Sequence, residues 1–331
     1  MQTDSIQPFN KSMFVAILWI VLALAWLTGC SSGSQPETNP EVISLPTIFP
    51  TETLTPSITH APTITLTLTT GLGLTSRSVL DGAVMVIYVP AGEFVMGSDP
   101  GTDPYFWGAE SPSHAVYVDA FWLYQTEVTN AMYQMCVEQK ACPRPDANRS
   151  STHKNYYGNP DYDNYPVILV SWVHAVSYCK WAGGRLPTEA EWEKAARGED
   201  GRLFPWGNSP LRGDLANFCD HDCPGNERES GLDDGYRDTA PVGSYPAGVS
   251  PYGALDMAGN VWEWVFDYFV PEYYKVSPLE NPLGPAFGTR RVIRGGSWYN
   301  PASGIRTVAR ASLTPDNALG TVGFRCAMDV P

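Results

Sequence analysis

The sequence predicts a single mixed α+β domain with little regular secondary structure, and three observations support this fold class. Runs of β-branched residues are short, as in residues 84–89 (VMVIYV). Three segments begin with a capping residue and are each about ten residues long, which is typical of short helices. The connections that follow are long and rich in Gly, Pro and Asn, and such loops usually need metal ions or disulfides to hold them in a compact domain.

Two stretches have the composition of β-structure. Residues 84–89 form the first strand candidate, and Pro90, Ala91 and Gly92 follow it. We expect this turn to fold residues 93–97 back onto the first strand as a hairpin. Residues 114–124 (HAVYVDAFWLY) are rich in aromatic residues and predict another strand.

Three helices are predicted from their capping residues. Thr129 caps a helix that starts at Asn130, and Ser171 caps a second helix that ends at residues 183–184. Thr188 and Glu191 form a capping box that opens a third helix, which Gly198 ends. The second helix is expected to place its apolar side chains on one face: Trp172, Val173, Val176, Cys179 and Trp181.

The first 29 residues have the pattern of an export signal. Residues 13–27 are uncharged and follow Lys11, and this run is short for a membrane-spanning helix, which needs about 20 apolar residues. It ends in LTGC, which resembles the bacterial lipobox, so Cys30 is expected to carry a lipid. The alternative is an uncleaved N-terminal anchor. Both predict an exported protein held at the cell membrane or cell surface.

Residues 30–80 are predicted to be an extended linker, and residues 81–331 the folded domain. Thr, Ser and Pro make up 25 of the 48 residues between Ser31 and Ser78, a composition that does not support a packed core. The formal net charge of the whole chain is −14. We expect no binding to nucleic acids, because the sequence has no basic patch to neutralise phosphates.

Six cysteines remain once Cys30 is assigned to the lipid. An even number in an exported protein predicts disulfides, although six cysteines allow fifteen pairings. The spacing of Cys219 and Cys223, with His221 between them, also permits a zinc site or a redox pair.

Nine motifs then occur in the order found in the formylglycine-generating enzyme family, also called the sulfatase-modifying-factor family. They are VPAGEFVMGS, TEVTNAMY, PVILVSW, GGRLPTEAEWEKAARG, FPWGN, TAPVGSYPAG, YGALDMAGNVWEW, RVIRGGSW and GFRCA. The resemblance covers residues 84–328. It implies a single mixed domain related to the C-type-lectin fold, which periodicity alone does not give.

The resemblance also implies a set of disulfides and two structural calcium sites. The disulfides would join Cys179 to Cys326, Cys136 to Cys142 and Cys219 to Cys223. Loop carboxylates and carbonyls suit calcium, which takes six to eight oxygen ligands. The implied ligands are Asn217, Phe218, Asp234 and Tyr236 at the first site, and Asp256, Gly259, Val261 and Glu263 at the second. The alternative is ordinary turn chemistry, since Asp and Asn before Gly are common without a metal.

The resemblance implies copper chemistry that this sequence does not support. Active members of the family oxidise a substrate cysteine with molecular oxygen, and two cysteines after the GGS turn hold Cu(I). Here the first position is Asn300, the second falls near Gly304 or Ile305, and no cysteine occurs between Cys223 and Cys326. An amide cannot replace a thiolate as a ligand for Cu(I), so we expect no copper.

The sequence therefore favours a binding module over an oxidase. We expect a groove for a peptide, a glycan or a protein partner around the GGS turn, with no confident catalytic residue. The predicted groove residues are Arg294, Ser297, Trp298, Tyr299, Asn300, Arg306 and Arg310. The alternatives are an enzyme of a divergent branch of the family, with different metal or oxidative chemistry, and a true formylglycine generator.

Overall fold

The computed structural model describes residues 76–79, 84–101, 103–225 and 227–331. The signal, Cys30 and nearly all of the predicted linker lie outside these residues. The α-helices are α1 (Asn130–Glu138), α2 (Trp172–Trp181) and α3 (Glu189–Arg197). The 3-10 helices are η1 (Gly108–Glu110), η2 (Pro160–Tyr162), η3 (Pro246–Gly248), η4 (Tyr273–Lys275) and η5 (Ala302–Gly304). No helix among the described residues is long and apolar enough to cross a membrane.

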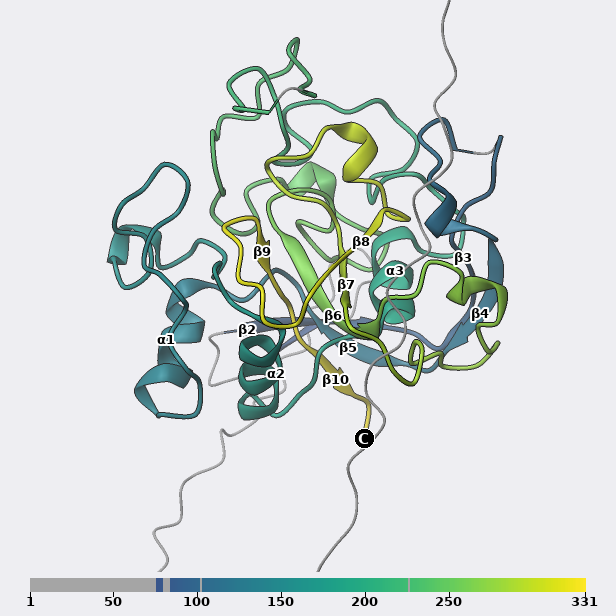
Figure 1. The fold of residues 1–331 in the computed structure, drawn as a ribbon, viewed down its shortest axis with the longest axis horizontal. Coiled ribbons are helices and arrows are strands. Elements are labelled where there is room, and N and C mark those ends of the chain that lie inside the picture. Colours follow the sequence, from purple (N-terminus) through teal and green to yellow (C-terminus); the bar gives the residue numbers. More distant parts are fainter. Residues whose placement is uncertain (1–75, 80–83, 102, 226) are drawn as a thin grey trace, which may run out of the picture. The chain divides into compact units, whose positions relative to one another are not determined.

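Among the described residues, ten short strands form three sheets, and Figure 1 shows how these strands are arranged. The strands are β1 (Ser76–Val79), β2 (Val84–Val89), β3 (Gly92–Met96), β4 (His114–Val118), β5 (Phe121–Tyr124), β6 (Trp262–Tyr268), β7 (Arg291–Arg294), β8 (Arg310–Leu313), β9 (Val322–Gly323) and β10 (Ala327–Asp329). The sheet orders are β1-β2-β5-β10, β3-β4 and β8-β7-β6-β9, and only the β6–β9 pair is parallel. Between residues 198 and 261 the described part of the chain has no α-helix or strand. The predicted fold class is confirmed.

The predicted hairpin at the start of the domain is wrong. β2 pairs with β1 and β5, whereas β3 pairs with β4, so the strands on either side of the Pro90 turn belong to different sheets. The predicted strand over residues 114–124 is likewise two strands, β4 and β5, in separate sheets. β1 also lies before the predicted domain boundary at residue 81, so the sheet extends into the segment assigned to the linker.

The three helices begin where their capping residues predict, and α2 ends at Trp181, two residues before the predicted Gly183. The hydroxyls of Thr129, Ser171 and Thr188 each accept a hydrogen bond from a backbone amide in the first turn. Glu191 completes the capping box of α3, and Gly198 ends this helix with a φ of 70°. The predicted buried face of α2 needs correction: Val173 is exposed, and the buried residues are Ala175, Tyr178 and Cys179.

Side chains alternate between the two faces of a strand, and the central strands bury both faces. On β2, Val86 belongs to a core cluster that contacts α1 and α2, whereas Ile87 belongs to a cluster that contacts α3. On β6, Trp264 and Val265 divide in the same way between the two clusters. Figure 1 shows α1 and α2 on one side of the sheets, with α3 on the other side near β3 and β7.

All three disulfides implied by the resemblance are present: Cys179–Cys326, Cys136–Cys142 and Cys219–Cys223. The first joins α2 to the segment just before β10 and closes a loop of 147 residues. The other two close short loops, with sequence separations of 6 and 4 residues. The pairing of Cys219 with Cys223 removes both thiols from a zinc site.

Buried ion pairs fix α3 against the strands. Glu193 is fully buried, and its carboxylate accepts hydrogen bonds from Arg294 at 2.5 Å, Arg197 at 3.0 Å and the Gly97 amide at 2.7 Å. Glu189, at the start of the same helix, accepts two bonds from Arg310, each of 2.8 Å. Charges buried in a protein interior need such partners, because water is not available to solvate them.

Candidate functional site

The GGS turn follows β7, and its backbone requires two glycines. Gly295 and Gly296 have φ angles of 94° and 74°, in the left-handed region that side chains disfavour. A Cβ atom on Gly296 would also lie 2.6 Å from the carbonyl oxygen of Gly304. The turn buries Ser297 and Trp298, and the Trp298 amide donates to the carbonyl of Asn260 at 2.9 Å.

The side chain of Asn300 folds back onto this turn. Its Oδ1 accepts hydrogen bonds from the Ser297 hydroxyl at 2.8 Å and from the Ser297 amide at 3.1 Å. A Cβ atom on Gly304 would lie 2.9 Å from the Cβ of Asn300. The resemblance assigns copper ligands to Asn300 and to a second position near Gly304 or Ile305. The structure places Gly304 beside Asn300, and none of these residues carries sulfur.

Tyr299 is the exposed member of the turn, with 45% of its surface accessible. Its ring meets the Trp298 ring edge to face, with 5.4 Å between the centroids. The disulfide loop of residues 219–223 lies beside it, since the Cys219 amide donates to the Asn300 carbonyl at 2.9 Å. An exposed aromatic side chain on a well-supported turn can contact a ligand at low cost in conformational entropy.

The three arginines predicted to line the groove are inside the domain, which corrects that prediction. Each is at least 97% buried and forms short ion pairs with buried carboxylates. A guanidinium engaged in this way is not available to a ligand at the surface. The pairs are Arg294 with Glu193, Arg306 with Asp103 and Glu110, and Arg310 with Glu189.

The first predicted calcium cluster is assembled by the fold. The Asp234 carboxylate accepts the amides of Phe218 at 2.8 Å and Tyr236 at 2.9 Å, so both ligand segments meet at this side chain. Asn217 is fully buried, and its Oδ1 has no hydrogen-bond partner among the described residues. A buried oxygen of this kind is costly to leave unpaired.

Burial also affects the protonation of this cluster. Desolvation raises the pKa of Asp234 to about 7, because the charged form loses its hydration. The amides of Phe218 and Tyr236 oppose this shift by donating to the carboxylate. A bound cation would favour the ionised form in the same way.

The second predicted cluster has an excess of buried negative charge. Asp256 and Glu263 are buried, and Glu263 forms two 2.7 Å bonds with Arg325. Glu263 Oε2 also accepts the Trp192 indole N–H at 2.8 Å, so Oε1 has the more open lone pair.

A third carboxylate, from Glu127, adds to this cluster, and the sequence analysis missed it. The Glu127 side chain is fully buried, and Oε2 has no partner among the described residues. Burial, and next the neighbouring Asp256 carboxylate, raise the pKa of Glu127 well above its ordinary value. Three carboxylates therefore lie near one guanidinium, and the carboxyl groups of Glu127 and Asp256 also interact with each other. The one signal for Glu127 in the sequence was its position just after the apolar predicted strand of residues 114–124.

The two clusters and the GGS turn are adjacent. Asn217 and Gly259 form a parallel bridge, and the Asn260 amide donates to the Asn217 carbonyl at 2.8 Å. The Gly259 amide donates to the carbonyl of Gly295, also at 2.8 Å. Gly259 approaches so closely that a Cβ atom would lie 2.0 Å from the Asn217 carbonyl oxygen. An ion at either cluster would therefore support the turn that carries Tyr299.

Fold and turn together define a domain of the formylglycine-generating-enzyme type, which is related to the C-type lectins. The sulfatase-modifying factor enzyme 1-like domain matches residues 75–330, and the chain belongs to this family.

Sequence and structure comparisons agree with this assignment. The chain is 37% identical to the formylglycine-generating enzyme of Streptomyces coelicolor over 286 residues, which cover 73% of this chain and 88% of that protein. It is 34% identical to the hercynine oxygenase of Mycolicibacterium smegmatis over 275 residues, covering 74% and 61% of the two chains. The structure of PvdO from Pseudomonas aeruginosa matches with a TM-score of 0.63 and 26% identity, covering 75% of this chain and 95% of that one.

Proposed function

We propose that this chain is a non-oxidase binding module of the family, with its recognition surface at the turn around Tyr299. The observation that carries this proposal is the absence of sulfur where copper chemistry needs two thiolates, at Asn300 and at the second position near Gly304 or Ile305. Cu(I) is a soft ion that prefers sulfur ligands. The Asn300 oxygen is also already used by Ser297. Ligands of this surface would be a peptide, a glycan or a protein partner.

The proposal includes an anchor that keeps the module outside the cytoplasmic membrane. Cys30 would carry the lipid, and residues 31–75 would span the distance to the domain. Acyl chains contribute about 0.8 kcal/mol per buried CH2, so more than one chain gives a firm attachment.

Two calcium ions would stabilise the loops beneath the turn. The first would be held by Asn217, the Phe218 and Tyr236 carbonyls and Asp234. The second would be held by Asp256, the Gly259 and Val261 carbonyls, and Glu263, and we add Glu127 to this set. Support comes from the two buried oxygens without partners, Asn217 Oδ1 and Glu127 Oε2. The role of both ions is structural: they neutralise carboxylates that the fold buries.

Calcium is expected to stabilise the protein more at about pH 8 than at about pH 5.5. Without the ion, folding raises the pKa of Asp234 to about 7, so stability falls as pH rises from about 4 through 7. Calcium binds the ionised carboxylate and removes this penalty at high pH, whereas protons compete with it at low pH. The difference in Tm between samples with calcium and with a chelator measures the effect at each pH.

Two variants test whether the Tm gain from calcium arises at the two proposed sites, and a third variant is the control. Asn217→Ala and Glu127→Gln are each expected to reduce the Tm gain from calcium. Asp316→Asn removes an exposed carboxylate elsewhere on the domain and should leave the gain unchanged. A Tm that is the same with calcium and with chelator at both pH values would show that both sites are wrongly assigned.

One experiment with two arms tests the binding module against the oxidase. In the first arm, the purified protein is analysed for metals and incubated under oxygen with a Cys-x-Pro-x-Arg peptide. We expect no stoichiometric copper and no conversion of the cysteine to the aldehyde. In the second arm, glycan and peptide arrays are probed with the protein and with Tyr299→Ala. We expect binding that the variant loses without a change in Tm, because Tyr299 is exposed.

Each result decides between the functions. Copper binding or aldehyde formation would overturn the non-oxidase assignment. Array binding that is equal for the protein and Tyr299→Ala would remove the turn as the recognition surface. Turnover of another substrate would favour an enzyme of a divergent branch, a reading that the likeness to hercynine oxygenase supports.

A further inference from the structure

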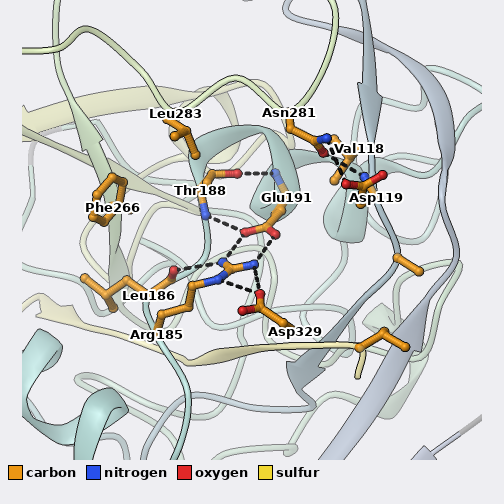
Figure 2. A pocket seen from close by; sticks show the side chains of 12 residues that line it. Val118, Asp119, Arg185, Leu186, Thr188, Glu191, Phe266, Asn281, Leu283 and Asp329 are labelled. Atoms are coloured by element: carbon orange, nitrogen blue, oxygen red, sulfur yellow. Dashed lines mark hydrogen bonds and ion pairs between the residues drawn. The ribbon is translucent and has the colours of Figure 1, made fainter.

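A cavity of about 430 Å³ lies away from the GGS turn and shares no residue with it (Figure 2). Residues from five separate parts of the chain line it: the end of β4, the segment that leads into α3, β6, the loop around Leu283 and residues 329–330. In Figure 2, Phe266 and Leu283 lie on one side of the cavity, and Asn281 and Asp119 lie on another. The volume is within the range of sites for small molecules, which is about 300–1,000 Å³.

The cavity has apolar walls that reach the surface. Leu186 and Val118 are buried at its lining, whereas Phe266, Leu283 and Val330 are 41%, 60% and 41% exposed. An apolar group that covers these side chains would bind favourably, since burial of apolar surface contributes about 25 cal/mol per Å². The ligand should therefore have an apolar stem or ring.

Among the described residues that line this cavity, Arg185 is the only cationic one, and all of its donors are used. It forms bonds of 2.7 and 2.6 Å to the two oxygens of Glu191, and its Nε donates to Asp329 Oδ1 at 2.9 Å. The remaining N–H groups reach the Leu186 carbonyl and again Asp329. A guanidinium has five N–H donors, so none is left for an anionic ligand.

The lining carries three carboxylates against this one guanidinium: Asp119, Glu191 and Asp329. Both contacts of Asp329 with Arg185 use Oδ1, and the contact of Asp119 with Asn281 uses Oδ2. One oxygen of each exposed carboxylate is thus available to a donor that enters the cavity.

We propose that this cavity binds a small organic cation, a protonated primary amine carried on an apolar stem or ring. The ammonium contacts Asp119 or Asp329, and the apolar part packs against Phe266 and Leu283. The site is independent of the turn around Tyr299 and of the calcium clusters. Its selectivity is by charge: the excess of carboxylates attracts cations and repels anions.

Three probes of similar size and different charge test the proposal by calorimetric titration of the full-length protein at neutral pH. They are 2-phenylethylamine, 2-phenylethanol and 3-phenylpropanoate. We expect the amine to bind, the alcohol to bind roughly tenfold more weakly, and the carboxylate not to bind. Asp119→Asn and Asp329→Asn should each weaken the amine roughly threefold to fivefold, as expected for partly exposed ion pairs.

Control variants separate recognition from folding. Asp316→Asn makes the same chemical change at an exposed carboxylate elsewhere and should not alter affinity. Leu283→Ser removes an exposed apolar wall, so it should weaken the amine and the alcohol alike while the Tm is unchanged. The proposal is overturned if no probe binds, if the carboxylate binds as well as the amine, or if the two Asp variants keep full affinity.

Discussion

Replacement of Glu193 by alanine is expected to lower the free energy of unfolding by about 3–5 kcal/mol. Its carboxylate joins α3 to β7 through Arg294 and holds the Gly97 amide, and both charged side chains are fully buried. Without Glu193, the nearest counter-charge of the Arg294 guanidinium is lost in an interior that has little water. Urea denaturation of the variant and the parent protein measures this difference.

A matched exposed variant is the control for this result. Glu272→Ala removes the same charge from a surface pair with Lys275, in which the side chains are 75% and 58% exposed. Its expected effect is below about 1 kcal/mol, because surface ion pairs are screened by water. Equal losses in the two variants would mean that burial of the Glu193–Arg294 pair has no special effect on stability.

The double variant Cys179→Ala/Cys326→Ala is expected to lose about 5 kcal/mol of stability. The disulfide restricts the unfolded chain by closing a loop of 147 residues, and this entropy is regained when the bond is removed. On the same chain-entropy estimate, Cys136→Ala/Cys142→Ala should lose only about 2 kcal/mol, because its loop spans 6 residues.

Denaturation midpoints of the two double variants under oxidising conditions distinguish these expectations. All four sulfur atoms belong to buried cysteines, so the two changes remove similar side chains from the interior. The comparison therefore isolates loop length. A larger loss for the Cys136–Cys142 pair would contradict the chain-entropy account for this domain.

Features with local causes were predictable from the sequence. The helices start at Thr129, Ser171 and Thr188 because a hydroxyl satisfies amides only a few residues away. The hairpin failed for the opposite reason. β2 satisfies its backbone with β5, more than thirty residues along the chain, and no nearby pattern specifies that partner.

The arginines show why the site was only partly predictable. Arg294 reads as a free charge in the sequence, but its partner Glu193 lies 101 residues earlier. Glu127 likewise meets Asn260 across 133 residues, so its place in the second calcium cluster could not be seen locally. The positions Asn300 and Gly304 were found because both lie within one short turn. The resemblance indicated that copper ligands would stand at these positions, and the structure showed that Asn300 and Gly304 are in contact.

The last strand determines when the domain can become complete. Within residues 325–329, Arg325 pairs with Glu263, Cys326 bonds to Cys179, and β10 forms the edge of the sheet beside β5. Contacts between such distant segments slow folding, and β5 presents an unpaired edge until β10 pairs with it. A growing chain therefore cannot complete its core before residues 325–329 have been synthesised. Until residues 325–329 have been made, the free edge of β5 is open to pairing with a strand of a second chain.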